Sequence, residues 1–159
     1  MSIPQSGGGP IEHHDQLAAY LASGCKPKAD WRIGTEHEKF GYCVDTHKPL
    51  PYDGDRSIHA VLSALRDRHG WAPLEEGGKL IGLEKDGANV SLEPGGALEL
   101  SGAPLETIHE TCDEVNAHLK EVMDISKEIG VGFIGLGAAP TWMHDEMPLM
   151  PKGRYKLMD

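Results

Sequence analysis

Two glutamates lie two residues apart in the segment GTEHEKF, residues 34–40. Side chains alternate between the two faces of a β-strand, so Glu36 and Glu38 would project from one face and His37 from the other. Neighbouring carboxylates repel each other, and a shared cation relieves that repulsion. Mg²⁺ takes oxygen ligands, so the pair could supply half of a magnesium site that also binds phosphate oxygens. The alternative is an ordinary strand face with both carboxylates in water beside Lys39.

A second acidic pair surrounds a Gly-Gly turn in SLEPGGALEL, residues 91–100. Glu93 ends one predicted strand and Glu99 lies in the next. Both could reach the cation of the first pair if the strands are neighbours. The glycines could equally serve only the turn, with both glutamates exposed. Two acidic pairs together favour the metal interpretation, because four buried carboxylates without a cation would carry a prohibitive desolvation cost.

Other patterns are less informative. Lys152, Arg154 and Lys156 form a small basic cluster suited to a carboxylate or phosphate, although an exposed tail is the alternative. Residues 130–135, GVGFIG, match the letters of a dinucleotide fingerprint, but a predicted helix precedes them and a loop follows, so we expect a buried strand. No P-loop motif occurs, so an ATP site would need another design. Cys112 lies on an apolar helical stripe and is expected to be buried.

The elements that would position these residues follow from hydrophobic periodicity and turn signals. An Asp-Gly turn between two apolar runs predicts a hairpin. Strands that arrive by hairpin, with helices between them, indicate an α+β fold with a largely antiparallel sheet and flanking helices. The predicted helices cover residues 12–23, 55–69 and 104–130, and the predicted strands cover 31–44, 79–84, 88–92, 97–101 and 131–136.

Composition restricts the partners. The formal net charge of −10 repels phosphate backbones and anionic lipids, so we expect neither a nucleic-acid nor a membrane partner. The three cysteines have no CxxC spacing, which argues against a disulfide scaffold and a zinc site. The first ten residues, MSIPQSGGGP, show no export signal. We predict a flexible leader over residues 1–10, one domain over 11–159, and a cytoplasmic protein.

Several long motifs, in order along the chain, resemble the plant and proteobacterial glutamate-cysteine ligase family. They are IGTEHEKF (33–40), SLEPGGALELSGAPL (91–105), ETIH (106–109) and MPKGRY (150–155). The resemblance extends from about residue 11 onward. It departs at Ala97-Leu98, where the family usually has Gln and an aromatic residue. Family sequences continue past the MPKGRY motif, so the resemblance implies an incomplete, N-terminal part of the catalytic domain.

The resemblance implies a glutamine-synthetase-like sheet that binds ATP and Mg²⁺. Its metal ligands would be Glu36, Glu38, Glu93 and Glu99, and Arg154, with Lys152 less directly, would bind substrate. The implied reaction joins the γ-carboxylate of L-glutamate to L-cysteine through γ-glutamyl phosphate, giving γ-glutamylcysteine, the first step of glutathione biosynthesis. The isolated chain would have little or no activity, and an unpaired sheet edge would favour self-association. Two alternatives stay open: a non-catalytic remnant that binds a ligand or partner, and a sister ligase with another amine acceptor.

Overall fold

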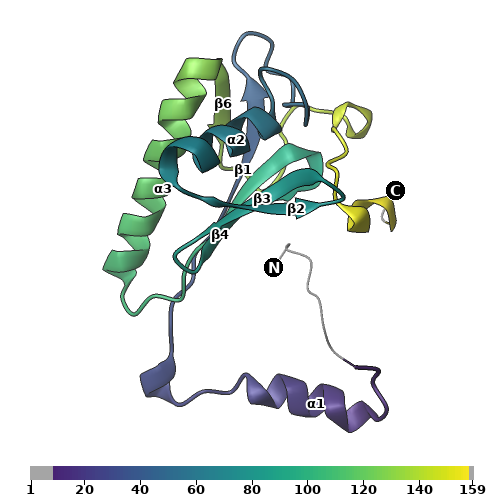
Figure 1. Ribbon diagram of the computed structural model, residues 1–159, viewed down its shortest axis with the longest axis vertical. Coiled ribbons are helices and arrows are strands. Elements are labelled where there is room, and N and C mark those ends of the chain that lie inside the picture. Colours follow the sequence, from purple (N-terminus) through teal and green to yellow (C-terminus); the bar gives the residue numbers. More distant parts are fainter. Residues whose placement is uncertain (1–8, 158–159) are drawn as a thin grey trace.

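The computed structural model describes residues 9–157, and within them a six-stranded antiparallel sheet is the centre of the fold (Figure 1). The strands lie in the order β2-β3-β4-β5-β1-β6. Strand β1 is thereby placed between β5 and β6, so the first acidic segment of the chain borders the second. The strands are β1 (Glu36–Cys43), β2 (Ala72–Glu76), β3 (Lys79–Lys85), β4 (Ala88–Glu93), β5 (Ala97–Ser101) and β6 (Val131–Ile134).

Tight turns join β3, β4 and β5. Asp86 and Gly87, between β3 and β4, both have positive φ angles, of 51° and 87°. This is the two-residue geometry that matches the twist of a hairpin, and it confirms the predicted Asp-Gly turn. Gly95 and Gly96, with φ angles of 74° and 77°, return the chain from β4 to β5. The antiparallel sheet that the turn chemistry predicts is therefore confirmed.

Two helices pack together beside the sheet, α2 (Ile58–His69) and α3 (Ile108–Ile129) (Figure 1). Ser57 caps the start of α2 by accepting a hydrogen bond from the Ala60 amide, and Gly70 ends that helix in the left-handed conformation. The core lies between these helices and one face of the sheet. Its fully buried side chains include Val61, Leu62, Leu65, Leu83, Val90, Leu92, Leu98, Leu100 and Ile125.

Several local predictions were wrong, among them the buried strand expected at residues 130–135, because β6 is an edge strand in which only Val131 is buried, and one strand was missed. The predicted strand from Trp31 begins only at Glu36, because residues 28–30 form a 3₁₀ turn and Ile33 makes only an isolated bridge to Leu105. Strand β2 was missed because Pro73 obscures its pattern, which an edge strand tolerates. Cys112 is exposed, because the buried face of α3 runs through Thr111, His118, Val122 and Ile125 instead.

The N-terminal helix α1 (His14–Ser23) lies apart from the sheet and its helices (Figure 1). It contains no buried residue, and the side chains of Leu17, Tyr20 and Leu21 are exposed. The leader predicted for residues 1–10 falls mostly outside the described residues. In residues 9–157, no helix is both long and apolar enough to cross a membrane.

The C-terminal segment returns to the sheet at the turn between β4 and β5. It contains the short 3₁₀ helices His144–Glu146 and Gly153–Leu157. The Trp142 ring packs edge-on against Phe40, with the ring centroids 5.8 Å apart. Met150 and Tyr155 are buried. Of the basic cluster near the end of the chain, Lys152 is therefore buried and not in an exposed tail, whereas Arg154 and Lys156 are exposed.

Candidate functional site

The four predicted glutamates lie on one face of three adjacent strands. In the register of the sheet, Glu38 is opposite Glu99, and Glu99 is in turn opposite Ser91. Glu36 is opposite Ser101 and Glu93 is opposite Ala97. Because side chains alternate along each strand, all of these residues share a face, and His37 and Lys39 project toward the helices. We call this the acidic face: Glu36, Glu38, Glu93, Glu99, Ser91 and Ser101.

Glu38 carries a perturbed carboxyl group on the acidic face. Its pKa is raised, first by burial and then by the negative charges of Glu93, Glu99 and Glu36. The charges of the other three carboxylates therefore all act on Glu38. Such a group of anions favours a cation or a proton, and carboxylate oxygens are the ligands that Mg²⁺ prefers.

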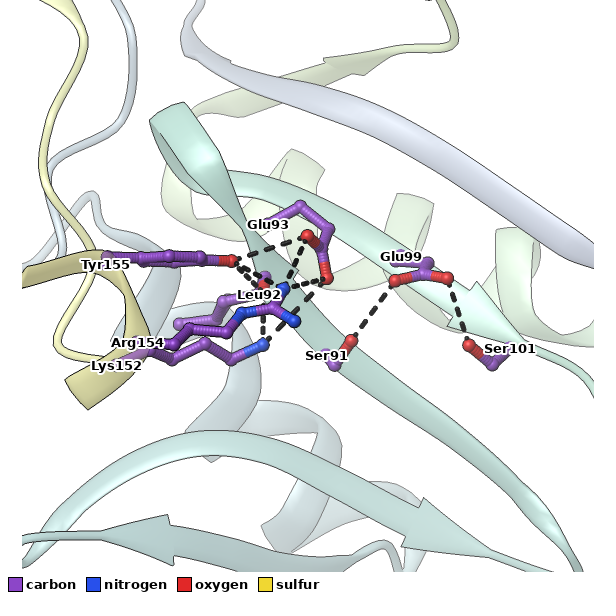
Figure 2. A network of polar contacts seen from close by, with 8 residues as sticks. All are labelled: Ser91, Leu92, Glu93, Glu99, Ser101, Lys152, Arg154 and Tyr155. Carbon is purple, nitrogen blue, oxygen red and sulfur yellow. Dashed lines mark hydrogen bonds and ion pairs between the residues drawn. The ribbon is translucent and has the colours of Figure 1, made fainter. Parts of the chain in front are cut away.

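Two serine hydroxyls hold Glu99 in place (Figure 2). Ser101 Oγ donates to one carboxylate oxygen over 3.1 Å, and Ser91 Oγ donates to the other over 3.4 Å. Glu99 is the most buried of the four glutamates, with 9% of its surface exposed. Its orientation is therefore fixed by neighbours on β4 and on its own strand.

Glu93 has basic partners from the C-terminal segment (Figure 2). Arg154 Nη2 lies 3.0 and 3.3 Å from its two carboxylate oxygens, and Lys152 Nζ lies 3.9 Å from one of them. Lys152 also donates to the Leu92 carbonyl. Burial lowers the pKa of Lys152 to about 8, and the charge of Glu93 opposes this shift. A predicted metal ligand is thus joined to the two predicted substrate-binding residues.

Tyr155 completes this network, and the sequence analysis did not single it out. Its hydroxyl donates to the Leu92 carbonyl over 3.0 Å and lies 3.4 Å from a carboxylate oxygen of Glu93. Burial raises the pKa of Tyr155 to about 12, so the phenol stays protonated at neutral pH. The feature of the sequence that could have identified Tyr155 is its position at the end of the MPKGRY motif, directly after Arg154.

Of the four glutamates, only Glu99 is buried. Glu36 and Glu38 are exposed, and the side chain of Glu93, 15% exposed, is paired with Arg154. Within residues 9–157, no three His, Cys, Asp or Glu side chains lie close enough together to hold a metal ion. The acidic face therefore aligns the carboxylates without gathering them into a coordination shell, and Lys156 is exposed away from this network.

A cavity of about 450 Å³ lies between the β4–β5 turn and the C-terminal segment. Its walls include Pro94, Gly95, Met147, Met150 and Tyr155. Tyr155 connects it to Glu93, so a molecule in this cavity would lie next to the acidic face. The volume is within the range of small-molecule sites.

An antiparallel sheet with an acidic face and an arginine at its edge is the arrangement that the glutamate-cysteine ligase resemblance implies. The sequence matches glutamate-cysteine ligase family 2 (GCS2) over residues 32–159, and the chain belongs to that family. It is 53% identical over 144 residues to the chloroplastic glutamate-cysteine ligase A of Oryza sativa subsp. japonica, which covers 91% of this chain. It is 52% identical over 149 residues to the chloroplastic glutamate-cysteine ligases of Brassica juncea and Arabidopsis thaliana, covering 94% of this chain.

These matches span 29% of the Oryza relative and 28% of the Brassica and Arabidopsis relatives. The chain thus spans less than a third of the length of these curated relatives. The names of the relatives also contradict the expected cytoplasmic location, because each is described as chloroplastic. That expectation rested on the first ten residues alone, which carry too little information about targeting.

Proposed function

We propose that this chain supplies the acidic face of an ATP-dependent glutamate-cysteine ligase. The reaction joins the γ-carboxylate of L-glutamate to the amine of L-cysteine and gives γ-glutamylcysteine, the first step of glutathione biosynthesis. The observation that carries the proposal is the row of carboxylates across β1, β5 and β4, with Arg154 at its edge. Membership of the family and about half-identity to named ligases support it.

Under this proposal, Glu36, Glu38, Glu93 and Glu99 hold Mg²⁺. The raised pKa of Glu38 supports the fit, because burial and then the neighbouring negative charges raise it, and a cation would offset both. Bound Mg²⁺ would supply charge neutralisation for the phosphoryl group in transfer from ATP. We further propose a glutamine-synthetase-like sheet for the whole catalytic domain, of which residues 11–159 are the N-terminal part.

Arg154 has a role suited to its geometry. Its guanidinium already binds a carboxylate, that of Glu93, at 3.0 and 3.3 Å. A planar guanidinium recognises carboxylates by paired hydrogen bonds, so the carboxylate of substrate glutamate could replace Glu93. Lys152 and Tyr155 would keep the C-terminal end of β4 in position during this exchange, through their bonds to the Leu92 carbonyl.

The chemistry proceeds in two steps. The γ-carboxylate of glutamate attacks the terminal phosphorus of ATP, and ADP leaves. The cysteine amine then attacks the γ-glutamyl phosphate, and phosphate leaves as the amide bond forms. In both steps negative charge develops at the transferred group, so a preorganised site that neutralises it lowers the barrier.

A second candidate is a non-catalytic protein that binds the same small molecules. One observation favours it: Ala97, where the family usually has Gln, is paired with both Phe40 and Glu93 and so lies on the same side of the sheet as the acidic face. An amide at that position would add a hydrogen-bonding group beside Glu93. A third candidate, a sister ligase, differs only in the amine acceptor.

The test is release of phosphate that requires ATP, Mg²⁺, L-glutamate and L-cysteine. The 159-residue chain is compared with a chain extended to the length of the relatives. We expect activity in the extended chain and little or none in the shorter one. Glu36→Gln or Glu99→Gln should lower the activity of the extended chain by about 100-fold or more, since each removes a metal ligand. Glu106→Gln, exposed outside the acidic face, is the matched control.

Other outcomes separate the candidates. Substrate binding without turnover in the extended chain would favour the non-catalytic binder. Turnover only with other amines would favour the sister ligase. Full activity of both glutamate variants would exclude the acidic face as the metal site.

A further inference from the structure

A second polar site lies on the opposite side of the sheet from the acidic face. It is a cavity of about 370 Å³ between α3 and strands β1 and β6. His37 and Lys39 reach it from β1, because they alternate with Glu36 and Glu38 along that strand. The cavity is therefore separated from the proposed ligase chemistry by the thickness of the sheet.

The ammonium group of Lys39 is the most unusual feature of this cavity. The residue is 1% exposed. Its Nζ atom lies 3.4 Å from the Leu98 carbonyl and 3.4 Å from His37 Nδ1, and both distances are long for hydrogen bonds. An ammonium has three donors, and burying one without a close anionic partner is costly. A negatively charged group in the cavity would offset that cost.

Two residues of α3, Ser126 and Lys127, add further hydrogen-bond donors to the cavity. The Ser126 hydroxyl lines the cavity and is buried, and no hydrogen-bond partner for it occurs in the described part of the chain. Lys127 is exposed and also lines the cavity. A hydroxyl donor and two lysines therefore converge on one space.

The lining of this cavity is positively charged, whereas the protein as a whole is negatively charged. No Asp or Glu occurs among its described lining residues, although the chain has a formal net charge of −10. Three other cavities in residues 9–157 each include at least one carboxylate. The cavity lined by Lys39 and Ser126 is thus suited to an anion.

Most of the remaining wall is apolar, although Tyr42 also lines the cavity; the apolar residues include Leu119, Val122, Met123, Val131 and Phe133. Inorganic phosphate would leave these walls without a contact. We propose that the cavity binds a small organic carboxylate. The carboxylate group accepts hydrogen bonds from Lys39 and Ser126, and the hydrocarbon part packs between α3 and β6. This site is independent of the proposed ligase function.

The test uses the 159-residue chain and a matched pair of probes, 4-methylpentanoate and 4-methylpentanamide. The two have the same hydrocarbon and differ in charge. Titrations followed by NMR should show saturable shifts of the His37 imidazole and of β6 amides with the acid. The amide should bind at least about tenfold more weakly, because it lacks the charge that Lys39 pairs with.

Variants assign the binding to these residues. Lys39→Met should weaken acid binding by about tenfold or more, and Ser126→Ala by about threefold. Lys120→Met, on an exposed part of α3 outside the cavity, is the control and should leave binding unchanged. If Lys39→Met does not fold, Lys127→Met with Ser126→Ala provides the same comparison.

Three results would overturn the proposal: no saturable binding of the acid, equal binding of acid and amide, or acid binding that survives Lys39→Met. Tighter binding of inorganic phosphate than of the acid would also overturn it, because the apolar walls would then have no role. None of these results bears on ligase activity, which is measured separately.

Discussion

Glu93 is bound by basic residues that lie about 60 positions further along the chain. Its carboxylate accepts hydrogen bonds from Arg154 and lies within ion-pair distance of Lys152, whose side chain is 1% exposed. A buried ammonium needs compensation from a nearby anion. Glu93 therefore has a structural role besides the proposed metal role.

Glu93→Gln tests that structural role. We expect the free energy of unfolding to fall by about 1–3 kcal/mol, because Lys152 would lose its paired anion. Urea denaturation followed by circular dichroism measures the change. Glu36→Gln is the matched control, since Glu36 is exposed on the same face, and it should change stability by less than about 0.5 kcal/mol. Equal effects of the two variants would contradict the assigned role.

Substitution of Glu38 should raise the stability of the chain, which is the opposite of the effect expected for Glu93. Its folded-state pKa is raised, so the folded state binds a proton more readily than the unfolded state does. Stability contributed by this group therefore falls as pH rises from about 4.5 through the raised pKa. Glu38→Gln should stabilise the chain at pH 7, by less than about 1 kcal/mol because water screens this exposed side chain. Unfolding measured at pH 4 and pH 7 should show the gain only at pH 7; a loss of stability at pH 7 would rule out net repulsion.

At the scale of elements, α3 has a complete capping box. Thr107 Oγ1 accepts from the Glu110 amide over 3.2 Å, and a Glu110 carboxylate oxygen accepts from the Thr107 amide over 2.8 Å. The apolar stripe in the sequence predicted that the helix exists. It predicted the wrong buried face in the first half, where Cys112 is exposed and Thr111 is buried.

Thr107→Ala should lower the free energy of unfolding by about 1 kcal/mol, because an orphan amide of the first turn loses its partner. Thr107→Ser keeps the hydroxyl and should restore most of the stability. Urea denaturation of the three proteins makes the comparison. A serine variant as unstable as the alanine variant would show that the methyl group, and not the cap, matters.

At the scale of the whole molecule, we expect the loss of folding stability at low pH to depend on His118. This side chain is 3% exposed, packs 6.3 Å from the Trp71 ring and has no partner for its ring nitrogens within residues 9–157. Burial, and then the charges of Lys39 and His37, lower its pKa to about 3. Between pH 6.5 and about 3, the unfolded state therefore binds a proton at His118 that the folded state does not bind. Stability should fall as pH falls through that window.

His118→Leu should flatten this part of the stability profile by up to about 1.4 kcal/mol per pH unit, since one proton is removed from the linkage. Thermal unfolding at several pH values between 4 and 7 measures the slope. His109→Leu, exposed on the same helix, is the control. An unchanged slope in the His118 variant would place the acid sensitivity elsewhere.

Exposed apolar side chains on α1 could promote self-association of the whole molecule. The side chains of Tyr20 and Leu21 on α1 are 78% and 76% exposed, and they lie close together on a helix apart from the sheet. We expect sedimentation velocity to show concentration-dependent association, because adjacent exposed apolar groups favour contact. The double change Tyr20→Ser and Leu21→Ser should reduce it, and Lys28→Ser should not. Association that is equal in all three proteins would point instead to the sheet edges.

The sequence by itself determined most of the elements, though not strand β2, and the family resemblance. Turn residues such as Asp86-Gly87 and Gly95-Gly96 require positive φ angles, and a spacing of two residues places Glu36 and Glu38 on one face, so local chemistry was sufficient. Only the tertiary structure decided that Glu38, Glu99 and Ser91 form one row, that Glu93 pairs with Arg154, and that Lys39 and Ser126 line the same cavity. These contacts join residues far apart in the chain. They depend on strand order and on the path of the C-terminal segment, which packing of the whole core sets and no local pattern encodes.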